Sequence, residues 1–200
     1  NNPFWAILMG IEHERIHIET SSVIIRRLPI DMVRPLPLWE ICPESGEPPQ
    51  NELLPVPGGR VAMGKPKDHP LYGWDNEFGH QTHDVPDFAA SRYLVSNREY
   101  LTFLDDGGYE QADHWTDEGR QWLGYSKATH PLFWVDSPDG YRFRTMARII
   151  DMPWNWPVEV NCLEAKAFCN WLAAKTGRPL RLPTEAEWYR LRDAHDIPDQ

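Results

Sequence analysis

Residues 157–188 read PVEVNCLEAKAFCNWLAAKTGRPLRLPTEAEW and carry the clearest local structure signals of the chain. Asn161 is a candidate N-cap for a helix over LEAKAFCNWLAAKT, because its side chain can accept from the free N–H groups of the first turn. Gly177 is placed to end that helix, since glycine readily adopts the left-handed conformation of a helix end. Thr184, followed three residues later by Glu187, matches a capping box and predicts a second helix.

Working back along the chain, the same logic predicts another helix and two strands. Ser96 with Glu99 predicts a capped helix through NREYLTFLDDGG. GGRVAMG at 58–64 is typical of a short strand with glycine ends, and VPDFAASRYLV at 85–95 alternates in part and predicts another. Long aromatic stretches without clear period lie between them. We therefore expect an α+β domain with several short strands, two or three helices and much irregular structure.

The N-terminal part differs from this domain. Residues from about Phe4 to Leu28 lack proline and predict one long helix, which Pro29 closes. At about 100° per residue, the side chains of this helix form two separate stripes, which is typical of a helix inside a bundle. One stripe contains Ile7, Ile11, Ile18 and Ile25, and the other contains Met9, His13, His17, Thr20 and Ile24. We expect its partner helices upstream and interpret the chain as a piece of a longer protein.

A proline-rich stretch separates the two parts. We predict a helix of a truncated bundle at 1–28, a linker at 29–52 that Trp39 and Ile41 could fix to a surface, and a second domain at 53–200, truncated at its C-terminal end.

Charge and cysteine content exclude some classes of function. A formal charge of −10 argues against nucleic acid as a partner, because phosphate binding needs clustered Lys and Arg. No apolar run approaches the ~18 residues that suggest a membrane span. Three cysteines without a C-x-x-C pair favour a reducing compartment, hence the cytoplasm. Cys162 and Cys169 fall on one helix face near Phe168 and Trp171, so we expect both to be free and largely buried.

The strongest candidate for chemistry is the stretch His13-Glu14-Arg15-Ile16-His17-Ile18-Glu19. Histidines four apart on a helix lie about 40° apart and can meet one metal ion, and neutral imidazole suits Fe, Zn or Cu. Two ordinary histidines are the plainer alternative. Glu19 lies about 160° from His17 and about 120° from His13, so it cannot reach the same ion. We expect Glu19 in an outer-sphere or inter-helix ion pair, or in solvent.

A third metal ligand must then come from another element. The candidates within the chain show no partner spacing that favours any of them; they are His69, His80, His83, His114, His130 and, least of all, His195. We favour a third histidine upstream.

The second domain resembles the formylglycine-generating-enzyme (sulfatase-modifying-factor) domain, a relative of the C-type lectin fold. The residues that carry the resemblance are GGRVAMG at 58–64, DNEFGHQTHDVPDF at 75–88, VSNREYLTFLDDGGY at 95–109 and the quoted stretch at 157–188, with its specific ending RLPTEAEW. The first helix resembles the end of a DinB-like four-helix bundle. Both domains occur together in the non-haem iron sulfoxide synthases of thiol-histidine biosynthesis.

Two strings are similar to the ovothiol branch of that family, the 5-histidylcysteine sulfoxide synthases: EHERIHIETSSVIIRRLP at 12–29 and TMARIIDMPWNWPVEVN at 145–161. The ergothioneine branch usually has a glutamine-rich interior where this chain has Glu14, Arg15 and Ile16. By this resemblance, His13 and His17 are two of three histidine ligands to Fe(II). The third ligand lies upstream and the family's catalytic tyrosine downstream, so we expect activity from the intact parent rather than from this piece alone.

The resemblance implies that cysteine, histidine and O2 are the substrates. Forming the C–S bond and oxidising the sulfur to a sulfoxide each remove two electrons, which together match the four-electron reduction of O2. Two alternatives remain open. One is the ergothioneine-type enzyme, which uses trimethylhistidine and another thiol. The other is a non-catalytic binding member of the lectin-like fold.

Overall fold

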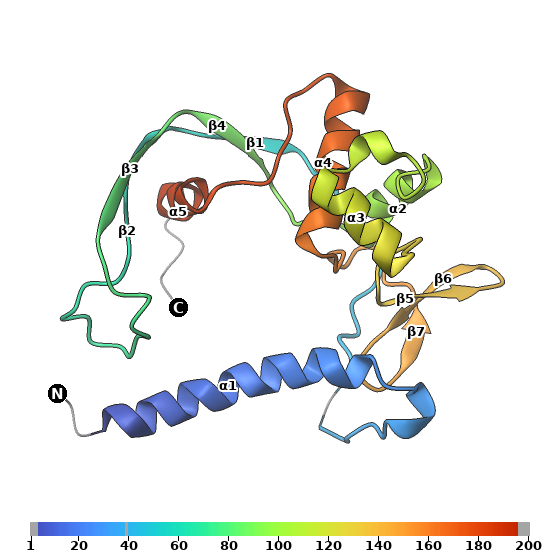
Figure 1. Ribbon diagram of the computed structural model, residues 1–200, viewed down its shortest axis with the longest axis horizontal. Coiled ribbons are helices and arrows are strands. Elements are labelled where there is room, and N and C mark those ends of the chain that lie inside the picture. The colour runs from blue at the N-terminus through green and yellow to red at the C-terminus, as the bar shows by residue number, and fades with distance from the viewer. Residues whose placement is uncertain (1–3, 39, 196–200) are drawn as a thin grey trace. The chain divides into compact units, whose positions relative to one another are not determined.

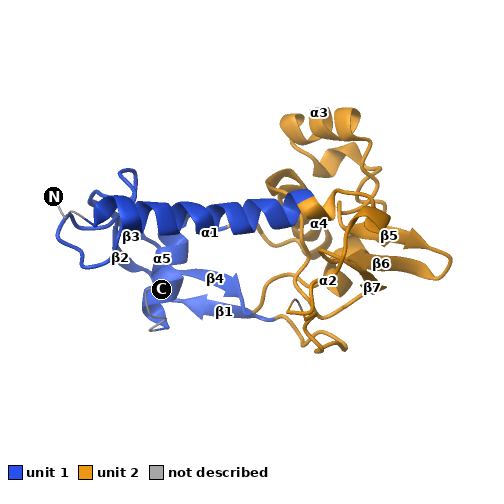
Figure 2. Ribbon diagram, turned by 90° about the horizontal axis from the view of Figure 1, so that it is seen from below, with its two compact units in different colours: residues 1–24, 52–92, 183–200 blue, residues 25–51, 93–182 orange. Residues whose placement is uncertain are grey.

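The computed structural model describes residues 4–38 and 40–195 (Figure 1). The chain forms two compact units, each built from separate stretches of sequence (Figure 2). Unit 1 contains residues 1–24, 52–92 and 183–200, and unit 2 contains residues 25–51 and 93–182.

Unit 1 consists of most of one long helix, two antiparallel strand pairs and the last helix. Helix α1 spans Trp5–Arg26, within two residues of its predicted ends, and its last two residues belong to unit 2. The other elements are β1 (Leu53–Val56), β2 (Gly59–Met63), β3 (Gln81–Val85), β4 (Phe88–Ser91) and α5 (Glu185–Ala194). Strand β1 pairs with β4, and β2 pairs with β3. Val61, Met63 and Val85 form a small core that α5 covers through Ala186 and Tyr189.

Unit 2 contains a helical cluster and a three-stranded antiparallel sheet in the order β5-β6-β7. Its elements are η1 (Ile30–Met32), α2 (Asn97–Asp105), η2 (Ala112–His114), α3 (Asp117–Ser126), β5 (Trp134–Ser137), β6 (Gly140–Arg144), β7 (Ile149–Asp151) and α4 (Cys162–Thr176). The helical core is aromatic. It contains Tyr100, Phe103, Trp115, Phe168 and Trp171, all at most 6% exposed.

The three predicted N-caps are confirmed, and each of them is part of a capping box. At Ser96, Asn161 and Thr184 the side chain accepts from the backbone three residues on, and the glutamate at that position accepts from the cap residue's own N–H. Gly177 ends α4 with φ 67°, as predicted. The expected mixture of helices and short strands is therefore confirmed.

The structure also has elements that the sequence did not reveal. Helix α3 follows a Thr116 cap, so after α1 the described residues form four helices instead of two or three. Strands β5, β6 and β7 lie in the aromatic stretches that showed no period. They are three to five residues long, too short to display an alternation of apolar and polar side chains.

The prediction that two cysteines are buried is wrong, although all three are free thiols. Cys162 is exposed and Cys169 is only half-buried. Cys162 is the first residue of α4, directly after the Asn161 cap, so it lies at the helix end. At about 100° per residue the two cysteines share one face of α4, but its buried side chains lie on the opposite face; they are Glu164, Ala167, Phe168 and Trp171.

Residues 29–51 of the predicted linker belong to unit 2 and contact its other segments. The Trp156 indole N–H donates to the Glu44 carbonyl oxygen at 2.7 Å, and Glu47 pairs with Arg98 at 3.3 Å. Ile41 is half-buried, while Trp39 lies outside the described residues. The predicted boundaries at 28 and 52 stay a prediction.

None of the helices described is long and apolar enough to cross a membrane.

A buried carboxylate joins α4 to the aromatic core. Glu164 is 3% exposed and accepts from the Tyr109 hydroxyl at 2.6 Å and from the Asn161 backbone N–H at 2.8 Å. Desolvation is the main cause that raises the pKa of Glu164, against the opposing hydrogen bonds from Tyr109 and Asn161.

We expect Glu164→Gln to show how the contribution of the Glu164 side chain to stability depends on pH. A carboxyl whose pKa is raised by folding favours the folded state when protonated, and that contribution is lost as pH rises through the folded pKa. The glutamine side chain has one acceptor oxygen for two donors, the Tyr109 hydroxyl and the Asn161 backbone N–H. The free energy of unfolding of the variant should therefore be lower by about 1–3 kcal/mol near pH 4. The loss should be smaller near pH 7, because the stability that the wild type gains from the raised pKa of Glu164 decreases as pH rises. Urea unfolding of both proteins at the two pH values measures this, and a larger loss at pH 7 would contradict it.

Candidate functional site

His13 and His17 face each other on α1. Their Nε2 atoms are 2.9 Å apart, and the ring centroids are 4.5 Å apart with the planes at 74°. One helical turn separates the two residues, which is why the rings meet. Both side chains are exposed, so a ligand can reach this edge of the helix.

This spacing fits a pair of neighbouring metal ligands. Two imidazole nitrogens ~2.1 Å from one ion, at about 90° to each other, lie about 3.0 Å apart. Both Nε2 atoms must then be unprotonated and both Nδ1 atoms must carry the proton. The same distance also permits one ring to donate a hydrogen bond to the other. The residues present therefore fit two positions on an Fe(II) ion.

Glu19 takes no part in this pair. Its backbone carbonyl accepts from the Ser22 hydroxyl, and no side-chain ion pair of Glu19 is present in the described part of the chain. Its heptad neighbours pair elsewhere, Glu12 with Arg15 at 2.8 Å and Arg26 with Glu159 at 2.6 Å. An outer-sphere role for Glu19 stays a prediction.

The structure brings no further histidine to the pair. Within residues 4–38 and 40–195, no three His, Cys, Asp or Glu side chains are grouped as a metal site would require. His83 is exposed on β3, His114 packs near Phe103, and His130 lies near Tyr141. The proposed third ligand from an upstream segment stays a prediction.

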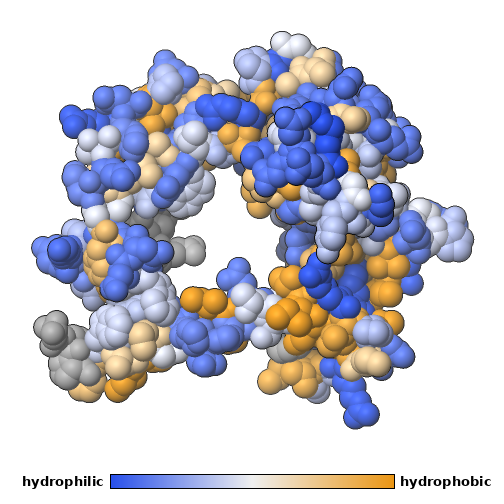
Figure 3. Space-filling view, viewed as in Figure 1, coloured by the Kyte–Doolittle hydropathy of each residue, from blue (hydrophilic) through white to orange (hydrophobic). Residues whose placement is uncertain are grey.

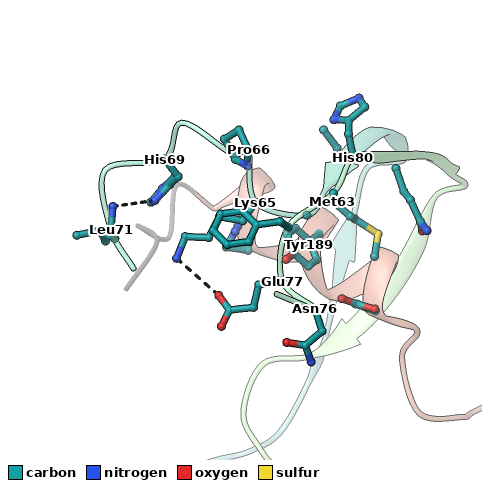
Figure 4. A pocket seen from close by; sticks show the side chains of 16 residues that line it. Met63, Lys65, Pro66, His69, Leu71, Asn76, Glu77, His80 and Tyr189 are labelled. Carbon is teal, nitrogen blue, oxygen red and sulfur yellow. Dashed lines mark hydrogen bonds and ion pairs between the residues drawn. The ribbon is translucent and has the colours of Figure 1, made fainter. Parts of the chain in front are cut away.

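Unit 1 also contains a cavity of about 830 Å³ between the β2–β3 loop and α5 (Figure 4). His69 and His80, two of the candidate ligands, line it together with Lys65 and Arg192. Lys65 Nζ donates to the Tyr72 carbonyl oxygen and lies 3.6 Å from the Glu77 carboxylate. These two interactions connect Lys65, at the start of the β2–β3 loop, with residues further along it. The Lys65 ammonium group therefore stabilises the wall of the cavity.

Aromatic rings connect that loop with the start of α1. Trp5 contacts Tyr72 with ring centroids 6.0 Å apart, and Tyr72 packs edge-on against Trp74 at 5.4 Å. The Tyr72 hydroxyl is buried without a hydrogen-bond partner among the described residues. Desolvation raises the pKa of Tyr72, and Asp75, Glu77 and Glu12 add to the effect. Both effects favour the protonated hydroxyl of Tyr72, whose ring packs between Trp5 and Trp74.

Sequence reasoning missed the arginines at the end of α1. Arg26 donates to both Glu159 carboxylate oxygens, at 2.6 and 2.7 Å, and to the Arg144 carbonyl oxygen. Its guanidinium carbon lies 3.4 Å from the centroid of the Phe133 ring. No sequence signal relates residues so far apart, although a cation in the last turn of a helix is a common feature.

Comparison with known proteins agrees with this architecture. A family described as "Sulfatase-modifying factor enzyme 1-like domain" matches residues 40–191. A hercynine oxygenase of Mycolicibacterium smegmatis is 33% identical over 194 residues, covering 94% of this chain and 42% of that protein. One from Mycolicibacterium thermoresistibile is 35% identical over 200 residues, covering 92% and 39%.

The formylglycine-generating enzyme of Thermomonospora curvata is also similar, with 31% identity over 155 residues, covering 68% of this chain and 46% of that enzyme. The chain spans about two fifths of the length of the two hercynine oxygenases. The family match covers β1 to β7 and all helices from α2 to α4. The chain therefore belongs to the sulfatase-modifying factor enzyme 1-like domain family.

Proposed function

We propose that His13 and His17 are two of three histidine ligands to Fe(II) in an O2-dependent enzyme that joins a thiol to the imidazole of a histidine. The observation that carries this proposal is the 2.9 Å separation of the two Nε2 atoms. The names of the relatives, oxygenase and formylglycine-generating enzyme, support an oxidative reaction. The ion would supply the redox chemistry with O2.

The residues of the chain would hold and orient that ion. Four-residue spacing on one rigid helix keeps the two ring nitrogens together before any metal binds. The third ligand would come from a segment that packs on α1, which we assign to a DinB-like bundle. Helix α1 has no buried residue among those described, and Ile7, Ile18 and Ile24 are more than half exposed. Exposed apolar side chains on both stripes of the helix suit a bundle interior.

For the substrates we propose cysteine and histidine, with 5-histidylcysteine sulfoxide as the product. Glu14, Arg15 and Ile16 between the two ligands are the residues that favour this ovothiol-type reaction. Coupling and sulfur oxidation together release four electrons, which O2 accepts to give one sulfoxide oxygen and one water. The reaction balances without an external reductant.

A second candidate is the ergothioneine-type reaction on hercynine, the trimethylated histidine. The specific observation in its favour is that relatives of 33% and 35% identity are named hercynine oxygenase. A methylated ammonium group would need an aromatic or apolar environment in place of hydrogen-bond acceptors. The two candidates share the metal site and differ in the substrate amine.

Product analysis by mass spectrometry separates these candidates. The full-length protein, loaded anaerobically with Fe(II), would receive 18O2, cysteine and an equal mixture of histidine and hercynine. We expect a coupled histidine sulfoxide that contains one 18O atom. Coupling of hercynine alone would favour the second candidate, and γ-glutamylcysteine is the thiol to test with it. If neither imidazole is coupled to either thiol, the proposed function is wrong.

We also infer that the enzyme works in the cytoplasm, on small molecules and without nucleic acid or membrane partners. Three free cysteines in the chain and a formal charge of −10 support this inference.

A further inference from the structure

Arg144 is a buried cation without a counter-ion among the residues that the structure describes. It ends β6 and is only 6% exposed. Its Nη2 donates to the Leu28 carbonyl oxygen at 3.2 Å, while its Nε is buried with no hydrogen-bond partner among the described residues. No carboxylate in that part of the chain forms an ion pair with it. A guanidinium removed from water without an anion is unfavourable, so this site is incomplete as it stands.

The neighbouring Arg26 does not relieve this deficit. The Glu159 carboxylate neutralises Arg26, and the Arg144 backbone carbonyl receives its other hydrogen bonds. Desolvation is the main cause that lowers the pKa of Arg144, and repulsion from Arg26 adds to it. The positive charge at this point exceeds the negative charge that the described residues supply.

A cavity of about 440 Å³ opens at these side chains. Its charged lining residues are all cationic, namely Arg26, Arg27 and Arg144. The remaining lining residues are apolar, and Leu132 and Leu28 are 57% and 46% exposed. Hydrophobic side chains also gather over this part of unit 2, around the end of α1 and the β5-β6-β7 sheet (Figure 3). The cavity thus has a cationic side and an aliphatic wall.

We propose that this cavity binds a small organic carboxylate with an aliphatic body. Arginine presents a planar fork of N–H donors that matches a carboxylate, and the Arg144 Nε, which lacks a partner among the described residues, belongs to that fork. Arg27 is exposed at the rim and adds a second cation. The volume is in the usual range for small-molecule sites, ~300–1,000 Å³, which favours a small molecule over a protein segment. The aliphatic wall favours an anion with a hydrocarbon part over inorganic phosphate.

This site shares no residue with the proposed metal ligands. His13 and His17 belong to unit 1, whereas all lining residues of the cavity belong to unit 2. The proposal does not require the iron chemistry to be correct, and its test needs neither metal nor O2.

Binding of 4-methylpentanoate to the full-length protein tests the proposal, with 4-methylpentanamide as the uncharged match and inorganic phosphate as the anion without hydrocarbon. The thermal midpoint and saturation-transfer NMR would be measured without iron. We expect saturable binding and a rising midpoint with the carboxylate alone. Equal binding of the amide would show that the arginines are not used. Equal binding of phosphate would show that the aliphatic wall is not used. Either result, or no binding, would overturn the proposal.

Variants locate the binding. Arg144→Gln should abolish the response to 4-methylpentanoate, and Arg27→Gln should weaken affinity on the order of ten-fold. Arg142→Gln is the matched control, because Arg142 is on the same strand and pairs with Asp151 at the surface. We expect its affinity to be unchanged. If Arg144→Gln fails to fold, Arg27→Gln decides, and an unchanged affinity in that variant would overturn the proposal.

Discussion

Replacing His13 or His17 with alanine is expected to remove most of the bound Fe(II) from the full-length protein, and nearly all of its turnover. A three-histidine site reduced to two ligands holds the ion weakly, and the lost ring also positioned it. Iron content after anaerobic loading, measured with the rate of sulfoxide formation, gives both effects. The two variants should behave alike, because the rings contribute equivalent nitrogens 2.9 Å apart.

Two controls sharpen this test. Glu19→Gln changes a carboxylate on the same helix that lies off the histidine face. We expect it to cost at most the 10- to 100-fold typical of residues outside the metal's own ligands. His83→Ala removes an exposed histidine of β3 and should leave iron content unchanged. Full iron occupancy and activity in either ligand variant would contradict the assignment. A Glu19→Gln protein as iron-free as those variants would contradict the helix geometry that excludes Glu19.

The second large effect is expected from Gly108→Ala. A β-carbon at Gly108 would overlap the ring of Phe103, which is fully buried and cannot move aside. Gly108 also receives the Trp115 indole N–H on its carbonyl oxygen and donates to the Phe103 carbonyl oxygen, each at 2.8 Å. The backbone is therefore held from both sides. We expect a loss at or above the upper end of the ~1–3 kcal/mol usual for overpacking.

Gly124→Ala is the matched control. Gly124 lies in α3, is exposed, and has open space where the β-carbon would be placed. Alanine is the better helix former, so this variant should gain about 0.5–1 kcal/mol. Urea unfolding of both variants gives the comparison. A mild loss at Gly108 equal in size to the change at Gly124 would mean that the Phe103 ring can adjust.

Helix starts could be predicted from the sequence because the interactions that set them are local. The capping side chains form hydrogen bonds with a residue only three positions away, so the pattern can be recognised in the sequence; the caps are Ser96, Asn161 and Thr184. The His13–His17 pair was visible for the same reason, since one helical turn brings the two rings together. The third ligand has no such local relation to this pair and could not be identified.

Features that depend on distant residues were not predictable in this way. Arg26 and Glu159 meet only after folding, as do Trp156 and Glu44. Arg144 is buried and its Nε has no hydrogen-bond partner among the described residues, and no periodicity in so short a strand reveals this. Cys162 shows the opposite error, because the face that it shares with Cys169 was taken to be the buried one, whereas the buried side chains of α4 lie on the other side of the helix.

The same contrast between local and distant contacts bears on the order of events in folding. Each capped helix start closes a loop of a few residues, whose formation costs little chain entropy and is fast. Strand β1 instead pairs with β4, which lies far along the sequence, since Leu53 is opposite Ser91. Pairings of this separation slow a folding reaction at a given stability. We therefore expect the capped helices α2, α4 and α5 to be populated early, and the long-range contacts of unit 1, such as the pairing of β1 with β4 and the packing of α5 on β2, to form later.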